Sequence, residues 1–155
     1  MAWGQSPDGQ DYLNRMSAVV NSAAVAPGGS AVCQITVTEQ LTQFWAVVQS
    51  NFYNVAICDS AGVILPHTRD AASSYANHIA QFHFTVTVPA SAPAGALMVV
   101  YLHFGTASTV AADPSTGALV STIGANLMAP LSAVSGPHLM PPRSGSWAQS
   151  ISSAT

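Results

Sequence analysis

The sequence predicts an all-β protein, an antiparallel β-sandwich of the jelly-roll or immunoglobulin-like kind with extended arms at both ends. Three observations lead to this prediction. Apolar and polar residues alternate along residues 33–38 and 81–88, as they do in strands that bury one face. Prolines and glycines separate short runs, as in a sandwich with tight turns. Charged residues make up 6% of the chain, and the polar remainder is chiefly Ser, Thr, Asn, Gln and Gly, which suit strands better than solvated helices.

The N-terminal part of the chain is predicted to supply an arm and two strands. Residues 1–11 are polar and turn-prone, and are expected to form the N-terminal arm. A first strand runs from Tyr12 to Val20. The sequence Pro-Gly-Gly-Ser at residues 27–30 is a strong turn signal. The alternating residues 33–38 then form a second strand.

The next segments predict a hairpin. Residues 41–48 fit a short helix or a strand equally well by pattern alone. Residues 54–58 and 63–66 are strand-like and flank Asp-Ser-Ala-Gly at residues 59–62. Aspartate and glycine in these positions favour a tight turn, so the three pieces are expected to form a β-hairpin.

The strongest strand pattern lies at residues 81–88. One face is predicted to be buried and consists of Phe82, Phe84, Val86 and Val88, and the other is predicted to be more exposed or at an interface and consists of Gln81, His83, Thr85 and Thr87. Residues 97–104 are apolar on both faces apart from His103. This second pattern is typical of a central strand that is covered on both sides.

The C-terminal part of the chain loses the regular alternation of apolar and polar residues. Residues 110–123 are expected to supply one more strand pair, around a turn at 113–117. Residues 125–155 lack periodicity, and four prolines there argue against regular structure. The predicted organisation is therefore an N-terminal arm (1–11), a sandwich domain (12–124) and an extended C-terminal arm (125–155). Large apolar residues in the arms are expected to anchor them on a partner; these are Trp3, Leu127, Met128, Leu131, Leu139, Met140 and Trp147.

The charge balance excludes some classes of partner. The chain has no lysine, three arginines and six acidic residues, for a net charge of -3. Nucleic-acid binding draws its affinity from many basic contacts, so no nucleic acid is expected. No apolar run is long enough for a transmembrane helix, and the N-terminus lacks the pattern of a secretory signal. Assembly in the cytosol is therefore expected, with Cys33 and Cys58 as buried free thiols; a disulfide is the alternative.

The chain carries no convincing catalytic or metal-binding pattern. His83 and His103 are predicted on strands that could be neighbours and could share a Zn²⁺ ion, but no third ligand is marked by spacing. Residues 67–70, His-Thr-Arg-Asp, are interpreted as an exposed loop with an Arg–Asp pair. Neither a nucleophile elbow nor a phosphate-binding loop is present. We therefore expect no catalytic residue, no metal and no cofactor.

Several short motifs occur in an informative order. They are Phe44-Trp45, Asp59-Ser60-Ala61-Gly62 with Leu65-Pro66, Val86-Thr87-Val88-Pro89, Ala94-Gly95, and Tyr101-Leu102-His103-Phe104-Gly105. With these motifs the stretch from Tyr12 to Gly105, about 60% of the chain, resembles domain-of-unknown-function family 2341. The match departs from the family in the opening aromatic-basic cluster, here reduced to Tyr12 and Arg15, and in the bland strand 54–58. The resemblance implies a β-sandwich of bacterial surface or phage structural proteins, with an interaction role and no catalytic residues.

Two functions fit these observations. A free monomer with so few charges is expected to associate, because solubility depends on charged surfaces. The expected function is a non-enzymatic structural protein of the phage virion, decorating or cementing the capsid as a homo-oligomer, for example a trimer at a three-fold position. Its partners would be other copies and the major capsid protein or other virion proteins. The alternative is a glycan-binding or adhesive module, which would display aromatic residues beside Asp, Asn or Gln on one loop face.

Overall fold

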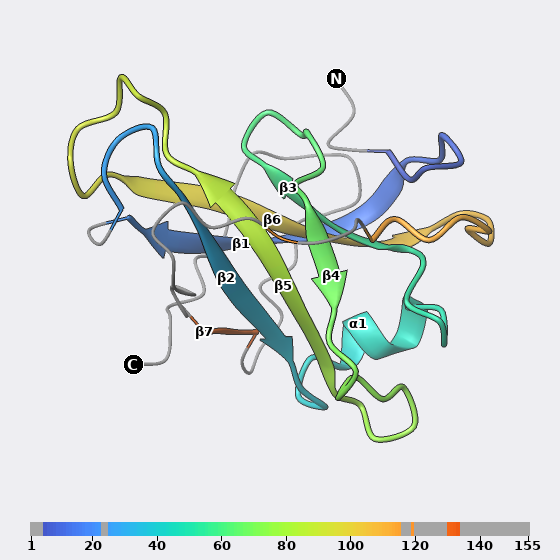
Figure 1. The fold of residues 1–155 in the computed structure, drawn as a ribbon. Coiled ribbons are helices and arrows are strands. Elements are labelled where there is room, and N and C mark those ends of the chain that lie inside the picture. The colour runs from blue at the N-terminus through green and yellow to red at the C-terminus, as the bar shows by residue number, and fades with distance from the viewer. Residues whose placement is uncertain (1–4, 23–24, 116–118, 120–129, 134–155) are drawn as a thin grey trace.

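The chain folds as two β-sheets packed face to face, and the all-β prediction is confirmed. A computed structural model describes residues 5–22, 25–115, 119 and 130–133. One sheet has the strand order β1-β6-β3, with β1 at Tyr12–Asn21, β6 at Leu97–Thr106 and β3 at Val55–Asp59. The other has the order β4-β5-β2-β7, with β4 at His67–Arg69, β5 at Ala80–Thr87, β2 at Ser30–Val37 and β7 at Pro130–Ala133. The strands of the four-stranded sheet cross those of the other sheet in the view of Figure 1.

Neighbouring strands are antiparallel, except that β7 runs parallel to β2. Within the described part of the chain the α-helical structure is the short α1, Thr42–Val47. No helix among the described residues is long and apolar enough to span a membrane. Apart from β4 and β5, the paired strands are not consecutive in the sequence.

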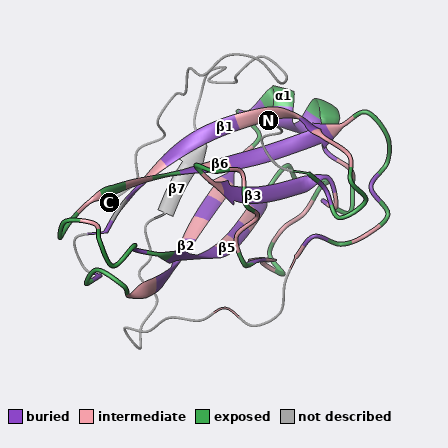
Figure 2. Ribbon diagram, turned by 90° about the horizontal axis from the view of Figure 1, so that it is seen from above, coloured by how far each residue is buried: buried purple, intermediate pink, exposed green. Residues whose placement is uncertain are grey.

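The core lies between the inner faces of the two sheets, where buried segments of the strands face each other (Figure 2). Alternate residues of β2 and β5 point inward, as the period-two patterns predict. The fully or nearly fully buried side chains of these two strands and of β6 include Cys33, Ile35, Val37, Phe82, Phe84, Val86, Leu102 and Phe104. Burial of this apolar surface is the main favourable contribution to folding.

Thr85 departs from the predicted pattern of β5. It was expected on the more exposed face with Gln81 and His83, but its side chain is buried. The cause is the link between β3 and β4, which runs alongside β5. The backbone N–H of Thr85 donates to the carbonyl oxygen of Pro66 at 2.9 Å. A local alternation pattern cannot report such a covering segment.

β6 is the central strand of its sheet, as predicted, but the prediction that it is covered on both faces is wrong for its first half. The side chains of Leu97 and Val99 are 68% and 38% exposed, whereas His103 and Phe104 are fully buried. The outer face of β6 is covered near His103, where the Tyr12 ring packs at 5.7 Å between ring centroids, and is left exposed at Leu97 and Val99.

The predicted hairpin turn is confirmed at residues 59–62. The carboxylate of Asp59 accepts hydrogen bonds from the N–H groups of Ala61 and Val63 at 2.9 and 3.0 Å. Gly62 follows with a φ of 87°, a conformation that glycine adopts at low cost. The ambiguous segment 41–48 resolves as α1, whose Trp45 donates from its indole nitrogen to the Thr38 carbonyl at 2.8 Å.

The ends of the domain differ from the prediction. The described part of the N-terminal arm folds back on its own chain, because Gln10 bonds Thr109 and Ser108, and Asp8 accepts from the N–H of Ala111. Residues 110–115 form no strand, so the predicted strand pair is wrong over that range.

The C-terminal segment was predicted to lack regular structure, and residues 130–133 correct this by forming β7. Pro130 is tolerated because it is the first residue of an edge strand, where a missing N–H donor costs little.

Gly105 offers a sharp stability test. Its φ is +76°, and a Cβ atom would lie 3.0 Å from both the Asn14 side-chain nitrogen and a Val47 methyl group. We expect Gly105→Ala to lower the free energy of unfolding by about 2–4 kcal/mol, from left-handed strain and overpacking together. Gly9 is the matched control, since its φ is +80° with nothing within 4 Å of the added atom. In urea titrations Gly9→Ala should lose about 1 kcal/mol; equal losses at both positions would contradict the packing argument.

Candidate functional site

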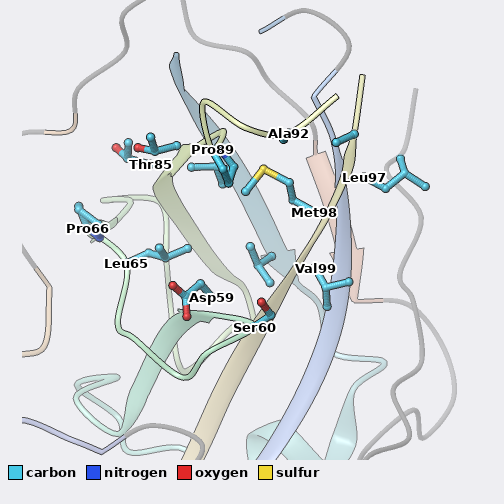
Figure 3. Close-up of a pocket in the computed structure, with 14 residues that line it drawn as sticks. Asp59, Ser60, Leu65, Pro66, Thr85, Pro89, Ala92, Leu97, Met98 and Val99 are labelled. Carbon is cyan, nitrogen blue, oxygen red and sulfur yellow. The ribbon is translucent and has the colours of Figure 1, made fainter. Parts of the chain in front are cut away.

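A groove opens at the end of the sandwich where β5 ends and β6 begins (Figure 3). Its volume is about 540 Å³. We call it the edge groove, and it is lined by residues 59–60, 65–66, 85–87, 89, 92 and 96–100. In size it falls within the range of ligand-binding and peptide-binding pockets.

The walls of the edge groove come from four segments of the chain. Leu65 and Pro66 belong to the link from β3 to β4, and Val86 belongs to β5. The loop from β5 to β6 supplies Pro89, and β6 supplies Met98, whose side chain points toward Pro89 in Figure 3. These side chains make the lining predominantly apolar.

The loop between β5 and β6 is held in shape by its own turns. The N–H of Ala92 donates to the Pro89 carbonyl at 3.0 Å, and that of Ala96 donates to the Pro93 carbonyl at 3.2 Å. Two prolines fix the backbone φ angle at their positions, and Gly95 takes a φ of 75° before the chain enters β6. The wall of the groove is therefore preformed.

Polar groups at the rim of the groove are already engaged. Asp59 carries the one charge among the lining residues, and one of its carboxylate oxygens accepts the turn hydrogen bonds described above. The Thr87 hydroxyl is 2.8 Å from the Ser30 hydroxyl across the β2–β5 ladder. The groove consequently presents an apolar surface with few polar groups left to direct a polar ligand.

The groove runs beside an open strand edge. β1 pairs with β6 along its whole length, from Leu97 to Thr106, on one side. On the other side β3 pairs with β6 only as far as Val100, opposite Asp59. Among the described residues, no strand pairs with residues 97–99 on that side. An open edge next to apolar side chains is a template for pairing with another strand.

A second feature, which we call the aromatic cluster, lies at the opposite end of β5. It consists of Trp45, Phe52, Tyr75 and His78. His78 stacks on Trp45 with ring centroids 4.7 Å apart, and Tyr75 is 37% exposed. Phe52 and His78 have φ angles of 62° and 52°, which is a strained backbone for residues other than glycine. Packing of the two rings compensates for the strain.

The two histidines that were considered as possible zinc ligands do not lie on neighbouring strands. His83 lies on β5 and His103 on β6, and these strands belong to different sheets. The local sequence pattern shows that each residue is in a strand but does not show which strands are neighbours. His83 instead faces Asp70, with 3.7 Å between the ring nitrogen and a carboxylate oxygen. Among the described residues, no group of three or more His, Cys, Asp or Glu side chains could hold a metal ion.

The interpretation of residues 67–70 as an exposed loop is also wrong. Residues 67–69 form β4, and the His67 side chain is buried with its Nδ1 donating to the Leu65 carbonyl at 2.8 Å. Arg69 pairs with Asp113 at 3.8 Å, rather than with Asp70. A three-residue edge strand is too short to leave a recognisable alternation.

The buried titratable groups are held in unreactive forms. Burial raises the pKa of the Cys33 thiol to about 11 and that of the Cys58 thiol to about 12. Burial, with the Arg15 charge nearby, lowers the pKa of His103 to about 3. The thiols are therefore protonated and the imidazole neutral at pH 7, whereas an activated cysteine needs a lowered pKa. Both cysteines are buried and free, as predicted, and lie in different sheets.

The predicted arm anchors fall mostly beyond the part of the chain that the structure describes. Trp3, Leu127, Met128, Leu139, Met140 and Trp147 lie outside the described residues. Leu131 is in β7, paired with Ile35 of β2 in the same chain. The edge groove itself was missed, although the proline-rich segment before β6 and the apolar residues 97–99 were visible signals.

Comparison with protein-family models, with curated proteins and with solved structures yields no match to this chain. The resemblance to family 2341 therefore stays a prediction. The fold and the edge groove are the grounds on which a function can be argued.

Proposed function

We propose that this chain is a non-enzymatic structural protein of a phage particle, which decorates or cements the capsid as a homo-oligomer. The observation that carries the proposal is the open edge of β6, where Leu97 and Val99 are exposed beside an apolar groove. Proteins that work as monomers usually shield such an edge with charges, prolines or a covering segment. Here the natural cover is another protein chain.

Two further observations support an assembly role. Charged residues are 6% of the chain, well below the roughly 25% typical of soluble domains, so large areas of the surface favour contact over solvation. The resemblance to a sandwich family of bacterial surface and phage structural proteins is consistent with an interaction role. The partners proposed are other copies of this chain and the major capsid protein or other virion proteins, with a closed, cyclic oligomer such as a trimer, which would suit the three-fold positions of an icosahedral shell.

Purified phage particles provide the test. We expect mass spectrometry of intact particles to find this chain at a copy number comparable with that of the capsid protein. A few copies per particle would replace the capsid location with a tail location. If the chain is missing from the particles, the proposal is wrong.

A glycan-binding module is the second candidate, and the aromatic cluster is the observation that favours it. Tyr75, Asn77 and His78 are exposed together in the loop before β5, which combines aromatic rings with an amide. A glycan array distinguishes the two candidates. Specific binding that is lost in Tyr75→Ala, by a chain that is not incorporated into particles, would favour the glycan-binding function over the structural one.

A further inference from the structure

We propose that the edge groove binds the C-terminal segment of a second copy, residues 146–152, as an added strand on the open edge of β6, with Trp147 in the groove. This inference rests on the proposed function, because it specifies how copies of the chain are joined. Each copy would offer one groove and one C-terminal strand, so the contact joins unlike surfaces of two copies.

The backbone of β6 supplies the first part of the argument. Residues 97–99 have a strand partner in β1 on one side and none, among the described residues, on the other. An extended segment laid along this edge would continue the line of β3 and gain main-chain hydrogen bonds. Strand addition of this kind obtains its affinity from the backbone and its specificity from pockets for alternate side chains.

The side chains around the edge supply the second part. Residues of β6 alternate, so that the side chains of Met98 and Leu97 leave the strand on opposite sides, with Met98 directed toward Pro89 (Figure 3). An added strand would alternate in the same way, with one set of side chains over the groove. A volume of about 540 Å³ with an apolar lining suits a large aromatic side chain.

The sequence of the occupant supplies the third part. After Pro142 and Arg143 the chain continues as Ser-Gly-Ser-Trp-Ala-Gln-Ser-Ile-Ser-Ser-Ala-Thr, residues 144–155, without a proline or a charge. Trp147 and Ile151 are four residues apart and so would share a strand face. An uncharged strand matches a groove whose one lining carboxylate is occupied by its own turn.

The chain between β7 and the proposed strand is long enough to reach a groove. β7 runs parallel to β2 and ends at Ala133, opposite Val37. The groove lies at the other end of β2, where Ser30 pairs with Thr87. The 12 residues 134–145 can span about 40 Å when extended. The span is longer than β2, so residues 146–152 can reach a groove, and the low charge of the chain, which favours association, points to the groove of a second copy.

The experiment uses full-length variants that disable one side of the contact each. Ala92→Trp fills the groove, and its matched control is Ala94→Trp in the same loop, at an exposed position that does not line the groove. Trp147→Ala disables the strand. By size-exclusion chromatography with light scattering over a dilution series, we expect Ala92→Trp and Trp147→Ala each to weaken self-association at least tenfold. Ala94→Trp should associate like the wild type. Circular dichroism checks that each variant is folded.

Mixing the two disabled variants tests whether the contact joins different copies. Ala92→Trp keeps an intact C-terminal strand, and Trp147→Ala keeps an open groove, so an equimolar mixture should form a one-to-one dimer that neither variant forms alone. A mixture that stays monomeric overturns the proposal, because an intact strand and an open groove on different copies then fail to bind each other. A fluorescein-labelled peptide of residues 144–155 should bind the Trp147→Ala protein. It should fail to bind a protein that carries both Ala92→Trp and Trp147→Ala.

The outcomes separate this inference from the proposed function. A wild-type oligomer that neither substitution weakens overturns the strand exchange and leaves the structural role intact. If the wild type is a monomer, and Ala92→Trp reduces its incorporation into particles, the groove binds a different virion protein and the second copy is excluded. A monomer that is also missing from particles overturns both.

Discussion

Phe84→Ala is expected to lower the free energy of unfolding by about 3–5 kcal/mol. Phe84 is fully buried on the inner face of β5, in the core between the two sheets. Its backbone pairs with Cys33 of β2 on one side and with His67 of β4 on the other. Strands on both sides fix the backbone, so the core cannot collapse easily into the space that the ring leaves.

The matched control is Gln81→Ala, a half-buried polar position on the same strand. It should change the free energy of unfolding by no more than about 0.5 kcal/mol. Urea titrations followed by circular dichroism measure both variants. A loss well under 1 kcal/mol for Phe84→Ala would show that the inner face of β5 is wrongly assigned.

Acid is expected to destabilise the fold through His103. This side chain is fully buried on β6, with the rings of Tyr12 and Tyr101 at 5.7 and 6.2 Å. Burial and then the Arg15 charge lower its pKa from 6.5 to about 3. The unfolded chain therefore takes up a proton as the pH falls through 6.5, while the folded protein does not until about pH 3. The stability present above pH 6.5 is progressively lost between these values.

The size of the acid effect follows from the pH interval. Between pH 7 and pH 4, the free energy of unfolding should fall by about 3 kcal/mol through this one group. His67, whose pKa burial also lowers, adds a loss of the same sign. Urea titrations at several pH values measure the dependence, and His103→Gln, which cannot titrate, should flatten it. An unchanged pH dependence in that variant would rule out His103 as its source.

The sequence predicted those features of the fold that depend on residues close together in the chain. The alternation of β2 and β5 follows from burial of one face, and the turn at Asp59 follows from the hydrogen bonds its carboxylate can make. Thr85 was misplaced because the segment that covers it, at Pro66, is not its neighbour in sequence. β4 was missed because three residues cannot display a period.

The candidate site depends on features that are still less local. His83 and His103 look alike in sequence, yet belong to different sheets, because sheet membership is a property of the whole topology. The open edge of β6 exists because β3 is short, and a strand's length relative to its partner is not encoded in either strand alone. The apolar residues 97–99 are visible in the sequence, but they were interpreted as part of a strand covered on both faces.

The pairing of β1 with β6 also bears on how the chain folds during synthesis. Tyr12 pairs with Thr106, so the first strand has no partner in its sheet until the sixth has been made. Closing so long a loop costs chain entropy before any contact repays it, and domains dominated by such pairings fold in milliseconds to seconds. The growing chain therefore carries an unpaired apolar strand until β6 leaves the ribosome. A ribosome-bound fragment that stops before residue 97 should resist proteolysis no better than an unfolded chain.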